Sequence, residues 1–574
     1  MDHKKEFLCW KNSGRLDDGM MQALSAMEKD DERVALCFGS TLQFGTAGLR
    51  GIMAPGPACM NIFTVAQATQ GIANLLLQVD GAKSSVAIAY DTRNNSELFA
   101  KTAACVLAAN GLRVFLFDGP RPTPELSFAI REYGCRAGIN ITASHNPKEY
   151  NGYKAYWEDG AQLPPDHAAT VSTEIAKIDM FNGAKTMDYE AALASGRITL
   201  LSEDTDAAYL KAVKSVAIYP ELLTELADDL RIVYTPLHGT GRILVPRILR
   251  ELGLTNLYTV DEQMTSDGNF PTVKKPNPES TEAFALGVAL ADRVGSDLVI
   301  ATDPDADRVG VMSRKADGSF ATITGNQMGA LLLDYVITAR RETGKMPPLP
   351  YAVKSIVSTD MARRICEVQG VKLYDVLTGF KFIGEVIKNH EEGGEPGSFL
   401  MGFEESYGYL FGGYARDKDA VSATAMICEM TAYYRRRGMT LSDALDALFR
   451  RYGYYLDKTH DIYMEGLDGI AKRKQTMERL RVCPPSAIGG HAVIRIGDYL
   501  RGSILDLTDG TENSTGCPAS DMLTFEVDCG DKIIIRPSGT EPKIKIYFLT
   551  HAKKEEDLAP KLNAYYEDAR HFAE

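Results

Sequence analysis

Three aspartates at alternate positions form the densest chemical signal in the sequence. The run DLVIATDPDADRVGV predicts a strand that ends in a tight turn carrying Asp303, Asp305 and Asp307. Such a turn can point three carboxylates at one centre. Carboxylates at this density favour Mg²⁺, a hard cation that keeps coordination positions open for phosphate oxygens. The three aspartates are therefore candidate metal ligands.

Three other kinds of acidic turn share part of this pattern. A calcium loop of the EF-hand kind needs glycine at its sixth position and glutamate at its twelfth, where this sequence has Arg308 and Arg314, so it is rejected. A phosphatase with an aspartyl nucleophile also places Asp-x-Asp after a strand and stays open as a minority alternative. A purely structural acidic turn is disfavoured, because crowded carboxylates repel one another unless a cation or Arg308 neutralises them.

A serine is presented within TASHNPKEYNGYK, where Ser144 is expected at the tip of a loop that follows a strand. It lacks the flanking glycine pair of the hydrolase elbow, so acyl transfer is not indicated. Lys154 or His145 could move protons or steady negative charge. Taken alone, the stretch could be an ordinary polar loop, but a serine together with a metal indicates phosphoryl chemistry. The residues expected to form the presenting turn are Asn146, Asn151 and Gly152.

An anion-binding loop is predicted at RPSGTEP, residues 536–542. Arg536 offers a planar fork of donors, Ser538 and Thr540 add hydroxyls, and Gly539 lets backbone amides approach an oxyanion closely. The plainer alternative is a hairpin loop with routine turn residues.

Two further loops were considered for ligand binding. In GFEESYGY, Glu404 and Ser406 are expected on one side of a short turn, where they suit vicinal sugar hydroxyls; buried acidity paired with a lysine or arginine is the alternative. HGTG, residues 238–241, lacks the third glycine of a dinucleotide-binding loop, and that reading is rejected.

The elements that must position these loops recur along the chain. SVAIAYDTR, LRIVYTPLHG and PYAVKSIVSTD each predict a strand followed by a helix, which closes at Gly111, Gly253 or Gly370 before a second strand. Three α/β domains with mainly parallel sheets are expected, with one large sheet as the alternative. KIIIRPSGTEPKIKIYFLT predicts antiparallel strands in a C-terminal α+β module. KADGS is expected to mark the end of the second domain. The expected parts of the chain are a helical N-terminal extension over 1–40, domains at 41–205, 206–320 and 321–440, a linker helix at 441–455 and a last domain at 456–574.

Composition narrows the class of protein. A chain of 574 residues with 45% hydrophobic and 24% charged residues indicates about three to five globular domains. A membrane role is not expected, and the N-terminus lacks the pattern of a secretory signal, so a cytoplasmic location is expected. The ten cysteines have no zinc or redox spacing and are expected to be reduced and structural. The net charge of −14 argues against general nucleic-acid binding.

TASHNP, DPDADR, GFEESYG and RPSGTEP, in this order, resemble the four signature loops of the α-D-phosphohexomutases, most closely the phosphoglucomutase and phosphopentomutase branch. The likeness covers the chain from about residue 40 onward. GTAGLRG resembles the family's entry loop, which implies Arg50 at the phosphoserine end of the cleft. TGFKFI resembles the loop that senses sugar orientation, which implies that Thr378, Gly379 and Lys381 contact substrate.

The resemblance implies a heart-shaped protein of four domains around one cleft. It implies that Ser144 is carried as phosphoserine, that one phosphoserine oxygen and the three aspartates hold one Mg²⁺ with Arg308 nearby, and that Lys154 is the acid/base lysine. Glu404 and Ser406 would contact the sugar. Arg536, Ser538, Gly539 and Thr540 would hold the distal phosphate.

The expected reaction is interconversion of glucose 1-phosphate and glucose 6-phosphate through glucose 1,6-bisphosphate, by a monomer or homodimer. Phosphopentoses or mannose phosphates on the same scaffold are the alternative substrates. A phosphatase, and a sugar-phosphate sensor without turnover, are weighed against it. The presence of Ser144, Lys154 and all three aspartates disfavours the sensor.

Overall fold

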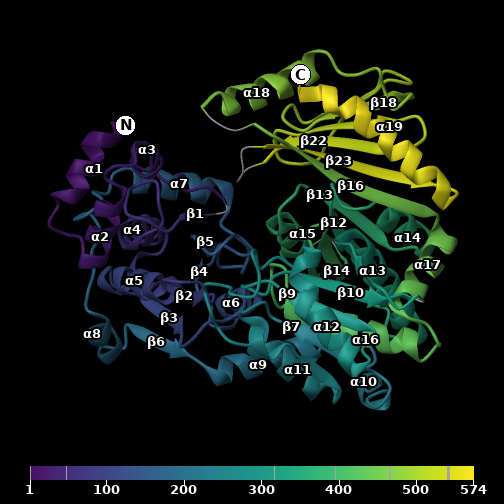
Figure 1. Cartoon of the computed structure of the whole chain (residues 1–574), viewed down its shortest axis with the longest axis horizontal. Helices are drawn as coiled ribbons and strands as arrows, with labels where there is room; N and C mark the ends of the chain where they lie inside the picture. The colour runs from purple at the N-terminus through teal and green to yellow at the C-terminus, as the bar shows by residue number, and fades with distance from the viewer. Residues whose placement is uncertain are drawn as a thin grey trace. The chain divides into compact units, whose positions relative to one another are not determined.

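The computed structural model describes residues 2–46, 48–315, 317–394, 396–464, 467–538 and 543–573, and the chain divides into two compact units. Unit 1 comprises 1–324, 384–395 and 407–440, and unit 2 comprises 325–383, 396–406 and 441–574. Figure 1 labels the helices and strands of both units. No helix among the residues described has the length and apolar character needed to cross a membrane.

Three short helices begin unit 1: α1 (His3–Lys11), α2 (Asp18–Met27) and α3 (Asp31–Phe38). Aspartate side chains cap all three helix N-termini by accepting backbone N–H bonds. Trp10 is fully buried and meets Phe38, Phe63 and Phe181 edge to face. This aromatic cluster fastens the helices to the domain that follows.

The first sheet of unit 1 has the strand order β1-β5-β4-β2-β3-β6. Its central strands are parallel, and β5 pairs antiparallel with both β4 and β1. Alternate residues of β2 face opposite ways, Val86 and Ile88 toward α4, α5 and α7, and Ala87 and Ala89 toward α6. The strands are β1 (Leu49–Ile52), β2 (Ser85–Tyr90), β3 (Arg113–Phe117), β4 (Ala137–Ile141), β5 (Tyr150–Trp157) and β6 (Ile198–Leu201), and the helices are α4 (Ile62–Val79), α5 (Ser96–Ala109), α6 (Thr123–Glu132), α7 (Pro165–Ile175), α8 (Tyr189–Ala194) and α9 (Glu203–Lys214).

The second sheet of unit 1 has the order β11-β10-β9-β7-β8, with β9, β7 and β8 parallel. The described residues of KADGS lie between β10 and β11, and β11 ends at Ile323. Helix α16 contacts α11 and α10. The elements are α10 (Leu222–Glu225), β7 (Ile232–Thr235), α11 (Gly241–Glu251), β8 (Leu257–Thr259), α12 (Ala285–Val294), β9 (Leu298–Thr302), β10 (Val309–Arg314), β11 (Phe320–Ile323), β15 (Gly408–Phe411) and α16 (Ala420–Arg435).

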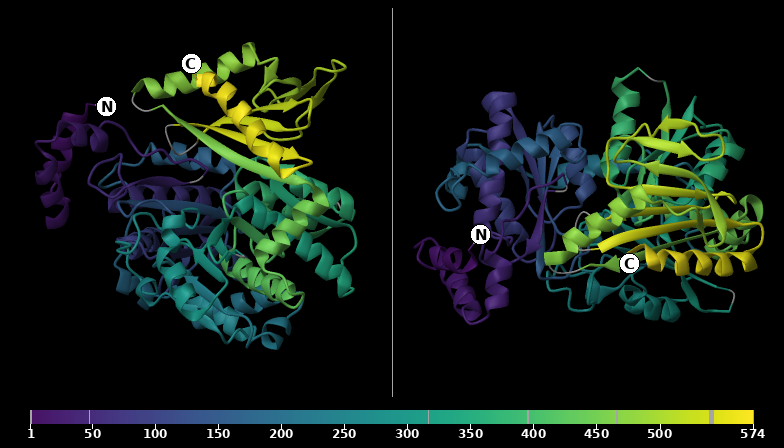
Figure 2. Two further views of the ribbon diagram at one scale, coloured as in Figure 1. Left: turned by 45° about the vertical axis from the view of Figure 1, so that its right-hand side comes forward. Right: turned by 90° about the horizontal axis from the view of Figure 1, so that it is seen from above.

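Unit 2 contains parallel strands in the order β13-β12-β14 and, after α17, an antiparallel sheet in the order β16-β23-β22-β21-β18-β19-β20. Helices α18 and α19 share one face of the antiparallel sheet, as Figure 2 shows, because Ile533 and Ile535 of β22 pack against both. The elements are α13 (Gly325–Glu342), β12 (Pro350–Ser355), α14 (Met361–Gln369), β13 (Lys372–Val376), β14 (Ser398–Glu404), α17 (Leu441–Tyr452), β16 (Tyr454–Tyr463), α18 (Leu467–Val482), β17 (Ala487–Ile488), β18 (His491–Asp498), β19 (Ser503–Asp506), β20 (Glu512–Ser514), β21 (Leu523–Val527), β22 (Lys532–Pro537), β23 (Lys543–Ala552) and α19 (Leu558–Arg570). Helix α15 (Phe380–Glu392) follows β13 in the chain.

The expected strand, helix, strand repeats are confirmed. They are β2-α5-β3, β7-α11-β8 and β12-α14-β13, and in each the two strands are parallel. Gly111, Gly253 and Gly370 follow the helices with φ of +86°, +96° and +62°. Only glycine adopts these angles without strain, which is why it ends each helix. The mixed α/β architecture with an antiparallel C-terminal sheet agrees with the predicted fold class.

Candidate active site

The three aspartates converge on one point at the end of β9. Asp303 follows the last residue of that strand, and the backbone turns back into β10, where Val309 lies opposite Thr302. Ala306 takes a left-handed φ of +49°, and the Asp303 carboxylate accepts the N–H groups of Asp307 and Arg308 at 3.1 and 3.0 Å. Ligand oxygens of the three carboxylates lie within 4.8 Å of one another, and all three residues are buried. The predicted cluster is therefore formed.

The HGTG loop packs against this turn. A Cβ atom on Gly239 would lie 2.5 Å from Pro304 Cα, and the Thr240 N–H donates to the Pro304 carbonyl at 2.8 Å. Only a residue without a side chain allows this approach of two backbones. Gly239 thus allows the HGTG loop to lie directly against the aspartate turn.

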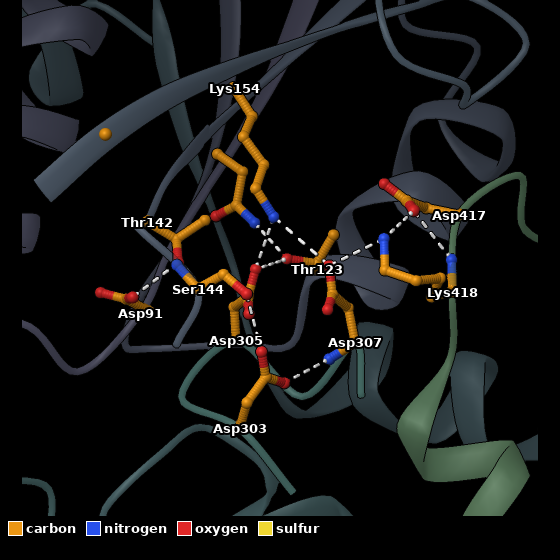
Figure 3. A network of polar contacts seen from close by, with 12 residues as sticks. Asp91, Thr123, Thr142, Ser144, Lys154, Asp303, Asp305, Asp307, Asp417 and Lys418 are labelled. Carbon is orange, nitrogen blue, oxygen red and sulfur yellow. Dashed lines mark hydrogen bonds and ion pairs between the residues drawn. The ribbon is translucent and has the colours of Figure 1, made fainter. Parts of the chain in front are cut away.

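Ser144 projects from the loop between β4 and β5 toward the aspartates (Figure 3). Its Oγ donates to Asp303 Oδ2 at 2.7 Å, and its exposed fraction is 3%. The residue has φ of +53°, a left-handed conformation that is uncommon for serine. Its N–H donates to Thr142 Oγ1 at 2.8 Å, and that hydroxyl donates to Asp91 Oδ2 at 2.7 Å. His145 Nδ1 lies 3.3 Å from Ser144 Oγ.

Arg93 holds the serine loop by its backbone carbonyls, a role that sequence reasoning missed. Its guanidinium donates to the carbonyls of Ser144 and Asn146 at 2.5 Å, and to those of Pro147 and Tyr150 at 2.9 and 3.1 Å. Its charge is balanced by the Asp91 carboxylate, 3.3 Å away. The signal was the pair of charges in DTR at the end of β2, since polar groups at carboxyl strand ends gather at one sheet edge.

Lys154 reaches the aspartates from strand β5. Its Nζ donates to Asp305 Oδ2 at 2.7 Å and to Asp307 Oδ2 at 3.3 Å. Lys418, which sequence reasoning also missed, lies 3.2 Å from Asp307 Oδ2 and 3.0 Å from Asp417 Oδ1 (Figure 3). Two ammonium groups therefore face the three carboxylates.

A buried hydroxyl completes the support of the aspartates. Thr123 donates its hydroxyl to Asp305 Oδ2 at 2.8 Å and its N–H to the Asp305 carbonyl at 2.8 Å. Asn140 in turn donates to the Thr123 hydroxyl at 2.6 Å. Because both the carboxylate and the backbone of Asp305 are held, its orientation is fixed before any ligand binds.

The turn expected from Asn146, Asn151 and Gly152 is only partly correct. Asn151 and Gly152 lie in β5, where they pair with Gly51 and Arg50 of β1. A Cβ on Gly152 would lie 2.5 Å from the Thr142 carbonyl oxygen, so glycine is needed for close approach of strands and not for a turn. Asn146 does lie in the loop and accepts from Arg50 Nη1 at 3.4 Å.

The electrostatics of the site favour an added cation. Burial raises the pKa of Asp303 well above its usual value, and repulsion from Asp305 and Asp307 raises it further. Burial would also raise the pKa of Asp305, but the Lys154 ammonium and the hydrogen bonds from Lys154, Asp303 and Thr123 together hold that pKa below the usual value. The pKa of Lys154 is raised, because attraction to Asp305 and Asp307 exceeds the effect of burial.

The pKa of His145 is shifted downward, whereas that of Asp303 is shifted upward. Burial lowers the pKa of His145 well below its usual value, and the nearby Arg308 and Arg50 charges lower it further. His145 is therefore neutral near pH 7. Arg308 itself forms an ion pair with Glu279 and lies 3.8 Å from Asp307 Oδ1.

The donor set fits a metal ion. Within the described part of the chain, Asp305 Oδ1 and Asp307 Oδ1 are buried without a hydrogen-bond partner. Such buried oxygens are costly unless something else satisfies them. Three carboxylates with two unsatisfied oxygens match the all-oxygen site of a hard divalent cation.

The predicted sugar and phosphate contacts lie in unit 2. Glu404 ends β14, is buried, and accepts the Gly379 N–H at 2.7 Å, so the TGFKFI loop and the GFEESYG turn meet. The Thr378 hydroxyl beside them is buried without a hydrogen-bond partner among the residues described. Lys381 lies over the Phe382 ring, and Ser406 is half-buried.

The arginine of RPSGTEP is held from its own sheet. Arg536 lies on β22 and donates to the Tyr547 hydroxyl of β23 at 2.9 Å. Ser538 follows the end of β22 and is half-buried. Gly539 and Thr540 lie outside the described residues.

Comparison with known proteins identifies the family. Models of the phosphoglucomutase/phosphomannomutase α/β/α domains I, II and III match residues 41–181, 207–318 and 324–452. The chain belongs to the phosphoglucomutase/phosphomannomutase family. It is accordingly an enzyme of the isomerase class. The expected resemblance to phosphohexomutases is confirmed.

Curated members of this family are similar over most of the chain. A phosphoglucomutase of Staphylococcus saprophyticus is 38% identical over 530 residues, which cover 92% of this chain and 94% of the relative. A phosphoglucomutase of Staphylococcus aureus is 36% identical over 554 residues, which cover 96% and 97%.

Solved structures of the phosphoglucomutase/phosphomannomutase family share the fold. Parafusin of Paramecium, described as a phosphoglucomutase in its open form, superposes with a TM-score of 0.68 at 19% identity over 93% of this chain and 95% of that one. A phosphoglucomutase/phosphomannomutase family protein of Burkholderia thailandensis has a TM-score of 0.63 at 19% identity, covering 92% and 97%.

Proposed function

We propose that the chain is a phosphoglucomutase that interconverts glucose 1-phosphate and glucose 6-phosphate. Ser144, as phosphoserine, gives its phosphoryl group to the free hydroxyl of the sugar monophosphate and forms glucose 1,6-bisphosphate. The second phosphoryl group of that bisphosphate then returns to Ser144. The observation that carries the proposal is the 2.7 Å contact between Ser144 Oγ and Asp303, inside a buried set of three carboxylates and Lys154.

The proposed metal is one Mg²⁺, held by Asp303, Asp305, Asp307 and an oxygen of phosphorylated Ser144. When bound, Mg²⁺ would neutralise charge on the transferring phosphoryl group. The two unsatisfied oxygens of Asp305 and Asp307 support this ligand set. Arg308 would keep its place at the edge of the cluster and partly offset its negative charge.

Proton transfer is assigned to Lys154. As the sugar hydroxyl attacks phosphorus, it must lose its proton, and the bond from phosphorus to Ser144 Oγ breaks. Lys154 Nζ is buried against Asp305 and Asp307, and its raised pKa keeps it as an ammonium, so we assign it to donate a proton to the departing Ser144 Oγ and to take the proton of the attacking hydroxyl in its place. His145, which is neutral at pH 7, can accept or donate a hydrogen bond at Ser144 Oγ but brings no positive charge. Arg50 is assigned to the same end of the site through its contact with Asn146.

Recognition of the sugar phosphate is assigned to unit 2. Thr378, Glu404 and Ser406 would bind hydroxyl groups of the sugar, with Gly379 and Lys381 shaping the same loop. Arg536 and Ser538, together with Gly539 and Thr540, would bind the phosphate that is not transferred. A guanidinium matches a phosphate dianion through two parallel hydrogen bonds, which supports the assignment of Arg536.

The test is turnover by the purified enzyme across sugar 1-phosphates. With catalytic glucose 1,6-bisphosphate and Mg²⁺, glucose 1-phosphate should give glucose 6-phosphate with the highest kcat/KM. A tenfold advantage for ribose 1-phosphate or mannose 1-phosphate would show that the family is right and the substrate wrong.

The role of Ser144 is tested separately. Peptide mapping should find phosphate on Ser144, and Ser144→Ala should lower kcat by at least about a thousandfold. Ser25→Ala is the matched control, because Ser25 is exposed on α2 and donates its hydroxyl to the Met21 carbonyl of the same helix. Full turnover by Ser144→Ala, or phosphate mapped elsewhere, would refute the assignment.

A further inference from the structure

A second group of metal-ligating side chains lies in unit 2, on the C-terminal antiparallel sheet. His491 begins β18, and Asp528 and Cys529 lie in the turn between β21 and β22. One ligand atom from each, a nitrogen, an oxygen and a sulfur, lies within 4.8 Å of the other two. None of these residues belongs to the aspartate cluster of unit 1.

The backbone holds these three residues together without a ligand. Strands β18 and β21 are paired, and the Asp528 N–H donates to the Ala492 carbonyl at 2.9 Å. The turn is closed by the Gly530 N–H, which donates to Val527 at 2.7 Å. His491 Nδ1 already lies 2.7 Å from Asp528 Oδ1. The donors are therefore fixed by a sheet, which orients a binding site better than a flexible loop.

A shell of polar groups surrounds the thiol. Cys529 Sγ donates to Asp531 Oδ2 at 3.5 Å and lies 3.4 Å from the Tyr565 hydroxyl. Asp531 is buried, and its carboxylate oxygens also lie 2.6 Å from Lys561 Nζ and 2.7 Å from His551 Nδ1. The Lys561 ammonium therefore lies next to the carboxylate that accepts the hydrogen bond from Cys529.

We propose that His491, Asp528 and Cys529 form a zinc site with a fourth position open to water. Nitrogen, sulfur and oxygen donors are the ligand set that Zn²⁺ takes, and ligand atoms of tetrahedral zinc sites lie roughly 3.3–3.8 Å apart. The three donor atoms lie within 4.8 Å of one another, and His491 Nδ1 and Asp528 Oδ1 are 2.7 Å apart, so the observed separations bracket that range. On binding, the Cys529 S–H bond breaks, its proton passes to water, and a zinc–sulfur bond forms. His491 Nδ1 exchanges its contact with Asp528 for the metal.

The ligand set separates this site from the aspartate cluster. Mg²⁺ avoids thiolate and imidazole, so millimolar Mg²⁺ does not compete for it. The aspartate cluster has no sulfur and gives no thiolate absorption with any metal. Zinc binding at His491, Asp528 and Cys529 is thus independent of the proposed function.

The test is a titration of the full-length enzyme with Co²⁺, which replaces Zn²⁺ and reports its ligands by absorption. In the presence of excess Mg²⁺, one equivalent of Co²⁺ should produce a thiolate-to-cobalt charge-transfer band, and Zn²⁺ should then remove it. Cys529→Ser should abolish the band. His491→Ala, which changes a half-exposed side chain, should weaken Co²⁺ binding by at least about tenfold.

Two controls make the result decisive. Cys483→Ser changes an exposed cysteine of the same unit and should leave the band intact. Asp305→Asn alters the aspartate cluster and should also leave it intact. The proposal is overturned if the parent enzyme shows no band, if the band survives Cys529→Ser, or if His491→Ala binds Co²⁺ as tightly as the parent.

Discussion

Lys154 gives the sharpest test of the proposed chemistry, because replacing it should lower turnover and raise the affinity for Mg²⁺. Its ammonium lies 2.7 Å from Asp305 and 3.3 Å from Asp307, two of the proposed metal ligands. Lys154→Met keeps an unbranched side chain that is one atom shorter and removes the charge and the ammonium protons. The site then loses its proton carrier and also a cation that repels Mg²⁺.

The two effects can be estimated. Loss of a positioned acid or base typically lowers kcat by about 10²–10⁴, or about 3–5 kcal/mol in the barrier. A pair of unit charges about 4 Å apart interacts by about 4 kcal/mol at an effective dielectric constant near 20. If one third of that repulsion is relieved, Mg²⁺ binds about tenfold more tightly to Lys154→Met.

The assay pairs coupled detection of glucose 6-phosphate with calorimetric titration of Mg²⁺. Lys177→Met is the control, since Lys177 is exposed and forms an ion pair with Glu174, away from the aspartate cluster. It should match the parent in both measurements. If Lys154→Met retains kcat within about threefold of the parent, or binds Mg²⁺ more weakly, the assigned role of Lys154 is wrong.

Three further predictions follow from the contacts described. Arg93→Lys loses the planar fork beneath the serine loop and should lower kcat about 10-fold to 100-fold with little change in KM; unchanged kcat would refute this. Arg536→Ala should lower kcat/KM for glucose 1-phosphate by about 30-fold or more, and an unchanged value would place the phosphate clamp elsewhere. Burial raises the pKa of Asp457 to about 7, and repulsion from Asp360 adds to it. The folded state therefore holds a proton that the unfolded chain releases, and stability falls as pH rises from about 4 to about 7. Asp457→Asn should raise Tm relative to the parent at pH 8 and much less at pH 4, whereas equal shifts at both pH values would contradict the assignment.

Much of the fold could be predicted because its signals are local. A β-rich run, a helix and a closing glycine recur three times, and each step reports on backbone preference within about 25 residues. The aspartate turn was also predictable, since three carboxylates at alternate positions need no distant partner to be noticed. The boundary predicted at KADGS stays a prediction, and a turn there was foreseeable because glycine and aspartate favour turns.

The supporting residues of the site could not be predicted in the same way. Lys418 reaches Asp307 from more than a hundred residues away, and Thr123 reaches Asp305 from the start of α6. These contacts depend on packing between elements, which no local pattern encodes. Gly152 was misplaced for a related reason, because close approach of two strands and a tight turn both require glycine.

The chain passes between the two compact units five times, after residues 324, 383, 395, 406 and 440. One of these crossings falls inside GFEESYG, between Ser406 and Tyr407. No single cut of the chain therefore separates the two units: a fragment ending at Thr324 lacks α16, which contacts α11. Recombination that exchanged one contiguous segment would split a folded body.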